Sequence, residues 1–166
     1  DSQMRTHSHY ASVESFIREV VADFAKHADS DACLILKHHP MDRAYCDYTE
    51  LCTQLEQIHG IKGRLFYLHE LHLPTVFKHC RGVVAVNSTV GLSAVLEGLP
   101  VKVCGRAIYD IPGLTYGGEL SDFWKAASRF CPDPEVRRGF NAYVITHTQM
   151  NGNAYRRLKL SAAHTG

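Results

Sequence analysis

The sequence predicts an α/β fold in which helices cover both faces of a parallel sheet. Short apolar runs alternate along the chain with segments of helical periodicity. The apolar runs are continuous, which is typical of parallel strands that are buried on both faces. Polar residues directly follow three of the runs, and open parallel sheets bind their ligands outside the carboxyl ends of the strands.

Four apolar runs predict the strands, and the segments around them predict the helices. Residues 8–28 repeat apolar side chains at three- and four-residue steps, which indicates an amphipathic helix. The last helix is expected to begin with Asp133 as its cap and Pro134 in its first turn. The expected strands are 32–36, 64–68, 82–86 and 101–104, and the expected helices between them are 48–58, 74–80 and 92–96.

The composition excludes several classes of protein. Lys+Arg 18 and Asp+Glu 17 give a net charge of +1, which argues against a polybasic nucleic-acid-binding module, and we expect no nucleic-acid partner. No run approaches the roughly 18 apolar residues of a membrane-spanning helix, and the N-terminus lacks the apolar core of a signal peptide. Because the sequence does not begin with Met, we expect a fragment of a longer chain.

Cysteine and histidine are frequent but do not form metal-binding motifs. The six cysteines include no CxxC pair and several lie in or beside apolar runs, so we expect buried free thiols. The 11 histidines show neither HExxH nor zinc-finger spacing, so we expect no metal site. A metal-binding regulatory domain remains a third hypothesis. Three nucleotide or hydrolase motifs are also missing, namely GxGxxG, the P-loop and GxSxG.

Three predicted strand ends carry polar residues that we expect to converge on one cleft. Ser88 and Thr89 lie between a strand and a helix, where hydroxyls and free N–H groups can bind phosphate, although either residue could simply cap the helix. The clusters are Lys37-His38-His39-Pro40, His69-Glu70 and Asn87-Ser88-Thr89.

Histidine offers chemistry at two of these strand ends. A protonated His39 could offset the charge of a leaving phosphate, or it could be an ordinary loop residue. His69 could contact a nucleobase or ribose, or no ligand at all. Arg106, Tyr109 and Asp110 follow the fourth strand, and whether they face the cleft is left open by the sequence.

Four segments occur in a characteristic order: KHHPMD at 37–42, YLHELHLP at 67–74, VNSTVGLSA at 86–94 and GRAIYDIPGLT at 105–115. This series resembles the bacterial capsule polysaccharide biosynthesis and export family, the β-Kdo (3-deoxy-D-manno-oct-2-ulosonic acid) glycosyltransferases of group 2 capsule assembly. The resemblance extends over nearly the whole chain. It implies a single Rossmann-like domain over residues 1–166, similar to the C-terminal, nucleotide-sugar-binding half of a two-domain GT-B glycosyltransferase.

The resemblance also implies an activity. The full protein would transfer Kdo from CMP-Kdo to a glycerophospholipid or a growing Kdo chain, with inversion and without a metal or other cofactor. The absent N-terminal domain would supply the general base and the acceptor site, so this fragment alone is expected to bind nucleotide without catalysis. The implied location is cytoplasmic and peripheral at the inner membrane, with capsule assembly and export proteins as further partners.

The resemblance also bears on the branch of the family and on individual site residues. Ser93 stands where many related GT-B sequences carry a ribose-binding Glu, which favours the branch that adds the first Kdo to lipid. The rival hypothesis is a non-catalytic structural component of the capsule export machinery. The implied residues are His39 as the catalytic residue; Ser88, Thr89, Asn87 and Lys37 at the nucleotide phosphate; and His69, Leu73 and Pro74 at the base or ribose.

Overall fold

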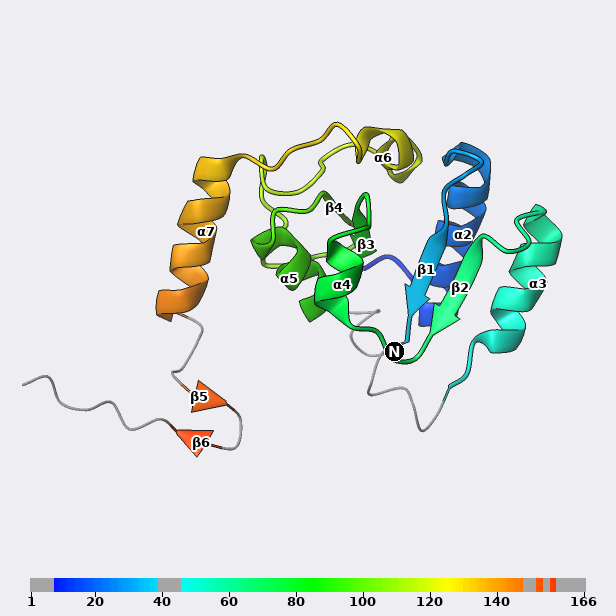
Figure 1. Cartoon of the computed structure of the whole chain (residues 1–166), viewed down its shortest axis with the longest axis horizontal. Helices are drawn as coiled ribbons and strands as arrows, with labels where there is room; N and C mark the ends of the chain where they lie inside the picture. The colour runs from blue at the N-terminus through cyan, green and yellow to red at the C-terminus, as the bar shows by residue number, and fades with distance from the viewer. Residues whose placement is uncertain (1–7, 39–45, 148–151, 154–155, 158–166) are drawn as a thin grey trace, which may run out of the picture.

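The computed structural model describes residues 8–38, 46–147, 152–153 and 156–157 (Figure 1). Strands and helices alternate as expected, so the α/β class is confirmed, and α6 is a helix that the periodicity did not indicate. The elements are α2 (Val13–His27), β1 (Leu34–Lys37), α3 (Thr49–His59), β2 (Leu65–Leu68), α4 (Leu73–Phe77), β3 (Val83–Ala85), α5 (Thr89–Leu96), β4 (Val101–Val103), α6 (Leu120–Ala126), α7 (Pro134–His147), β5 (Gly152–Asn153) and β6 (Arg156–Arg157).

Helix α2 begins later than its apolar pattern suggested, at Val13 rather than near Ser8. Ser12 caps the helix, because its hydroxyl accepts from the Ser15 N–H and the Ser15 hydroxyl accepts from the Ser12 N–H, both at 3.1 Å. This reciprocal arrangement is a capping box, which satisfies two backbone donors at once. The start of α2 is therefore fixed by local hydrogen bonding rather than by periodicity.

The strands are parallel in pairs, but they do not form the single sheet that the apolar runs predicted. Strand β1 pairs with β2, with Leu34 opposite Leu65, and β3 pairs with β4, with Val83 opposite Val101. Within the described residues these are two separate two-stranded sheets, and β5 and β6 form an antiparallel pair. The expectation failed because apolar runs report burial and do not specify which strands share hydrogen bonds.

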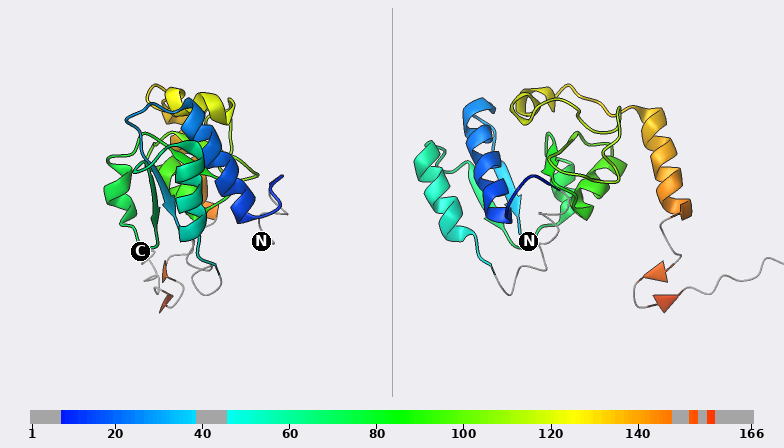
Figure 2. Two further views of the ribbon diagram at one scale, coloured as in Figure 1. Left: turned by 90° about the vertical axis from the view of Figure 1, so that its right-hand side faces the viewer. Right: turned by 180° about the vertical axis from the view of Figure 1, so that it is seen from behind.

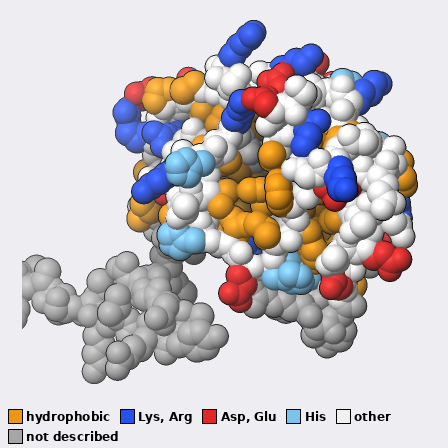
Figure 3. Space-filling view, turned by 45° about the vertical axis from the view of Figure 1, so that its right-hand side comes forward, with side chains coloured by type: hydrophobic (Ala, Val, Ile, Leu, Met, Phe, Trp, Pro, Cys, Tyr) orange, Lys and Arg blue, Asp and Glu red, His pale blue; other side chains and the backbone are white. Residues whose placement is uncertain are grey.

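Only one face of the β1–β2 sheet is covered, which corrects the expectation of helices on both faces. Leu34, Leu36 and Leu65 pack toward α2 and α3, whereas Ile35 and Phe66 are each 44% exposed on the other face. Helix α4 has five residues, and its Phe77 packs against the core around β3 and β4. Figure 3, which brings this side of the molecule forward, shows hydrophobic side chains gathered in a hollow of the surface.

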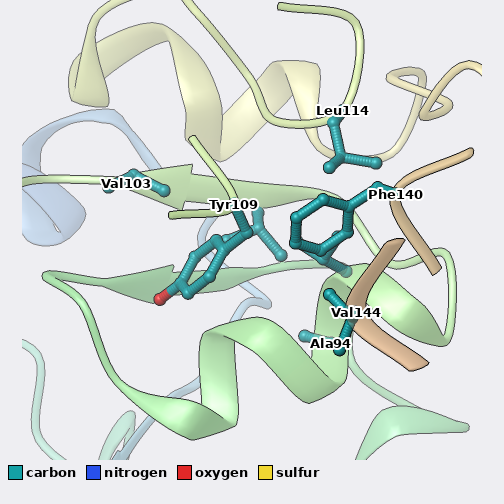
Figure 4. Packing of buried hydrophobic residues seen from close by; sticks show 8 residues of the cluster. Ala94, Val103, Tyr109, Leu114, Phe140 and Val144 are labelled. Carbon is teal, nitrogen blue, oxygen red and sulfur yellow. The ribbon is translucent and has the colours of Figure 1, made fainter. Parts of the chain in front are cut away.

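A second core lies around the β3–β4 sheet. Tyr109 and Leu114, from the loop after β4, pack there together with Ala94 of α5 (Figure 4). Helix α7 joins this cluster through Phe140 and Val144, which lie four residues apart and so on the same side of the helix. The β3–β4 sheet, α5 and α7 therefore share one core.

Helices α2 and α6 connect the two sheet regions. The Trp124 indole N–H donates to the Asp23 carboxylate at 2.6 Å, and the Trp124 ring lies edge-on to Phe24 with 5.3 Å between centroids. Tyr10, before α2, packs with Val86, which follows β3. Seen from behind, the segment before α2 runs across to β3 and β4 (Figure 2). In the part of the chain that the structure describes, no helix is long and apolar enough to cross a membrane.

The six cysteines are free thiols, as expected, but their predicted burial holds for few of them. Cys52 is buried on α3, whereas Cys33, Cys46 and Cys131 are exposed. Cys33 lies before the first residue of β1, so its place beside an apolar run does not bring it into the core.

Candidate functional site

The N-terminus of α5 has the geometry expected of a strand–turn–helix anion site. Ser88 is the N-cap residue, and its hydroxyl oxygen accepts from the Gly91 N–H at 3.2 Å. The hydroxyl proton of Ser88 remains available to a ligand, since a serine can donate and accept at once. Thr89 is exposed in the first turn, and Asn87 is half-buried beside it. The first N–H groups of a helix and its dipole favour an anion at this end.

Tyr109 stabilises this turn through a hydrogen bond to its backbone. Its side chain is 1% exposed, and its hydroxyl donates to the Ser88 carbonyl oxygen at 2.9 Å. Burial raises the pKa of Tyr109 to about 12, so the phenol keeps the proton that it donates. A Cβ atom on Gly91 would lie 2.3 Å from the Tyr109 hydroxyl oxygen, so a glycine is needed for this contact.

A pocket of about 490 Å³ lies at the carboxyl ends of β1 and β2. We refer to it as the β1–β2 pocket. It brings together two of the predicted site residues, Lys37 and His69, and the Lys37 ammonium donates to the His38 carbonyl oxygen at 3.1 Å. Its lining residues are Lys37, His69, Glu70, Leu71 and His72.

His38 supports this pocket, although the sequence assigned it no role of its own within the polar cluster at residues 37–40. Its side chain is 2% exposed, its Nδ1 is hydrogen-bonded to the Tyr67 hydroxyl, and its ring stacks on His69 with 4.7 Å between centroids. The signal was present in the sequence, because side chains two residues apart lie on the same face of a strand. Leu34, Leu36 and His38 follow this period, so His38 continues the buried face.

A carboxylate lies near the two imidazole rings. The Thr49 hydroxyl and backbone N–H both donate to Asp47, at 2.6 and 2.8 Å, and these hydrogen bonds hold the pKa of Asp47 below its ordinary value. Asp47 is therefore negatively charged at neutral pH, and it interacts electrostatically with His69 and His38.

The predicted residues are divided between the two places. Lys37 and His69 line the β1–β2 pocket, whereas Ser88 and Thr89 lie at α5 and are not among its lining residues. His39 and Pro40 lie outside the described residues, and Leu73 and Pro74 form the first turn of α4, directly after the pocket. Asp110 accepts a hydrogen bond from the Thr115 hydroxyl. Arg106 lines a different cavity.

Both places carry groups that can bind an anion, and the β1–β2 pocket also has the Glu70 carboxylate in its lining. Lys37 supplies a fixed positive charge, the α5 N-terminus supplies unpaired N–H groups, and His69 supplies a ring with two nitrogen atoms. Among the residues with described positions, no three His, Cys, Asp or Glu side chains lie close enough together to hold a metal ion.

Comparisons with known proteins relate the chain to capsule assembly. The sequence model of a family described as "Capsule polysaccharide biosynthesis protein" matches residues 1–155. The chain belongs to this capsule polysaccharide family. The resemblance inferred from the four motif segments is thereby confirmed at the level of the family. No solved structure matches the chain, so its likeness to a GT-B domain stays a prediction.

Curated relatives share this family and are much longer than the chain. The capsule polysaccharide export protein KpsS of Escherichia coli is 42% identical over 155 residues, which cover 93% of this chain and 39% of that protein. The capsule polysaccharide modification protein LipB of Neisseria meningitidis is 44% identical over 156 residues in the serogroup A and serogroup B strains, covering 93% of this chain and 37% of each relative. The chain thus spans about two fifths of the length of these relatives.

Proposed function

We propose that this chain is the donor-nucleotide-binding half of a CMP-Kdo-dependent β-Kdo glycosyltransferase that acts in capsule polysaccharide biosynthesis. The observation that carries the proposal is the meeting of Lys37 and His69 in one pocket at the carboxyl ends of two parallel strands. Open parallel sheets bind nucleotides at this edge. The Ser88-capped N-terminus of α5 and membership of the capsule family add support.

In this proposal the chain binds the nucleotide and stabilises the leaving phosphate. The Lys37 ammonium and the α5 N-terminus, with Ser88, Thr89 and Asn87, hold the phosphate of CMP. His39 in its protonated form offsets the charge that develops on that phosphate as the glycosidic bond breaks. These donors take the place of a metal ion.

The base and ribose are assigned to the neighbouring loop. His69 presents a ring to cytidine, and Leu73 and Pro74 follow it as apolar contacts at the start of α4. The acceptor, a glycerophospholipid or a Kdo chain, and the general base are proposed to bind in the N-terminal domain of the full protein. Inversion at the anomeric carbon stays a prediction, which the anomeric configuration of the product will test.

Calorimetric titration of the whole protein with CMP tests this proposal. We expect CMP to bind more tightly than UMP, and His39→Ala to weaken CMP about 10-fold or more by removing a charge-assisted contact. His59→Ala is the matched control. Helix α3 runs back from the carboxyl end of β1 to the amino end of β2, so His59 at its end lies far from the pocket.

The rival function, a non-catalytic component of capsule export, predicts the opposite result. It is favoured by the name of the relative KpsS, a capsule polysaccharide export protein. If the folded whole protein binds neither CMP nor UMP, the transferase proposal fails and the export role is preferred.

We also propose a cytoplasmic, peripheral location at the inner membrane, and loss of co-sedimentation with vesicles when anionic lipid is omitted would support it.

A further inference from the structure

Four rings come together at the carboxyl ends of β1 and β2, and we refer to them as the ring cluster. They belong to His38, Tyr48, Tyr67 and His69. Each ring contacts at least two of the others, with 4.7 to 6.4 Å between centroids. Of the four, His69 alone lines the β1–β2 pocket. The cluster therefore joins one pocket residue to three side chains that do not line the pocket.

His38 contacts all three other rings, and it occupies a position that suits an apolar side chain. It follows Leu34 and Leu36 on the buried face of β1, and its own side chain is 2% exposed. A buried polar ring costs free energy unless its polar atoms find partners, whereas a leucine would be buried without that cost. The histidine is therefore better explained by what its ring does for its neighbours than by packing alone.

Groups from β1, β2 and the residue before α3 hold His38 in place. Its Nδ1 is hydrogen-bonded to the Tyr67 hydroxyl of β2. The Tyr48 backbone N–H donates to the same hydroxyl oxygen at 3.4 Å, which ties the N-cap of α3 to this pair. The Lys37 ammonium donates to the His38 carbonyl oxygen at 3.1 Å. A buried ring with these partners is locked in its orientation by packing and hydrogen bonds.

His69 differs from His38, because its side chain is exposed and it follows the last residue of β2. Its ring stacks on the His38 ring, with 4.7 Å between centroids and 26° between planes. The Tyr67 ring adds a tilted contact at 4.9 Å. An exposed side chain loses rotamer freedom when a ligand orders it, and a ring that is already ordered avoids part of that cost.

We propose that His38 is a positioning residue that holds the ring of His69 in one orientation at the β1–β2 pocket. It acts through His69 and does not itself contact a ligand, since its side chain is buried. The benefit of the ordered ring to nucleotide binding rests on the proposed function, whereas the ordering of His69 does not.

NMR relaxation of the whole protein with carbon-13-labelled histidine rings tests the ordering, because the order parameter reports fast ring motion. The signal of His69 is identified by its loss in His69→Ala. We expect the order parameter of this ring to fall in His38→Leu. Val21→Ala is the matched control, because Val21 is fully buried in the same core as Leu65 and lies outside the ring cluster. It should lower stability and leave the ring order unchanged.

Calorimetric titration of the same variants with CMP tests the consequence for binding. We expect His38→Leu to weaken CMP binding about 2- to 10-fold, the factor that corresponds to ordering one side chain before binding. The same substitution made in His69→Ala should weaken CMP binding no further, because His38 acts through the ring that is then missing. A purely structural role of His38 predicts losses that add.

Tyr67→Phe keeps the test decisive if His38→Leu fails to fold, because it removes only the hydroxyl bonded to His38, and the same results are expected from it. The proposal is overturned if the His69 ring stays as ordered as in the unmodified protein, if Val21→Ala loosens it equally, or if the two losses of CMP affinity add. Absence of CMP binding by the unmodified protein contradicts the proposed function, and the ring order then decides the role of His38.

Discussion

At the scale of single residues, the N-terminal turn of α5 depends on a close fit between Gly91 and Tyr109. The Tyr109 hydroxyl reaches the Ser88 carbonyl oxygen by passing directly over Gly91. A Cβ at position 91 would also lie 3.1 Å from the Ala85 Cβ on β3. The strand, the helix and the loop after β4 therefore meet at a position where only hydrogen fits.

We expect Gly91→Ala to destabilise the protein by about 1–3 kcal/mol, the usual effect of overpacking a core. The gain in helix propensity from glycine to alanine offsets part of this cost. Urea denaturation measures the change in the free energy of unfolding. Gly117→Ala is the control, since a Cβ there meets no atom within 4 Å, and it should change stability by less than about 0.5 kcal/mol. Equal effects of the two substitutions would refute the close fit.

The site was predictable from the sequence where local pattern sets the geometry. Ser88 and Lys37 were predicted because polar residues after apolar runs mark strand ends, and the structure places Lys37 at the end of β1 and Ser88 directly before α5. His38 was predicted only as a member of the polar cluster at residues 37–40, whereas the period of two along β1 carries it into the buried face. The contact between Tyr109 and Ser88 joins distant segments, and no local pattern encodes it.

At the scale of elements, the two faces of the β1–β2 sheet differ sharply in burial. Leu65 is 6% exposed against α2 and α3, whereas its neighbour Phe66 is 44% exposed on the opposite face. Adjacent strand residues point to opposite faces, so these two side chains report on the two sides separately.

We expect Leu65→Ala to cost about 2–5 kcal/mol in unfolding free energy, because it leaves a cavity in the core. Phe66→Ala, one residue away on the same strand, should cost about 1 kcal/mol or less, because much of that ring is already in contact with water. Parallel urea denaturation of the two variants measures both values. A larger loss for Phe66→Ala would mean that its face is covered.

Helix boundaries were predictable where a cap is present in the sequence. Asp133 accepts from the Glu135 and Val136 N–H groups, at 2.8 and 3.1 Å, and α7 begins at Pro134 as expected. The division into two small sheets was not predictable, because strand pairing depends on how distant segments pack. Helix α6 was missed because it has seven residues, too few to display a clear period.

At the scale of the whole molecule, the proposed donor site draws on two places in the fold. The β1–β2 pocket and the α5 N-terminus offer groups that could bind a phosphate. The chain spans about two fifths of the length of its curated relatives. Catalysis is therefore proposed for the whole protein, with this chain supplying the donor site.

The most direct test of that claim is a transfer assay with the whole protein, CMP-Kdo and a glycerophospholipid acceptor, read as acceptor-dependent release of CMP. The account predicts release that falls by about 100-fold or more in His39→Ala, the usual loss on removing a group that stabilises charge in the transition state, and is unchanged in His59→Ala. A folded protein that releases no CMP in the presence of acceptor, or that keeps full activity in His39→Ala, would contradict it.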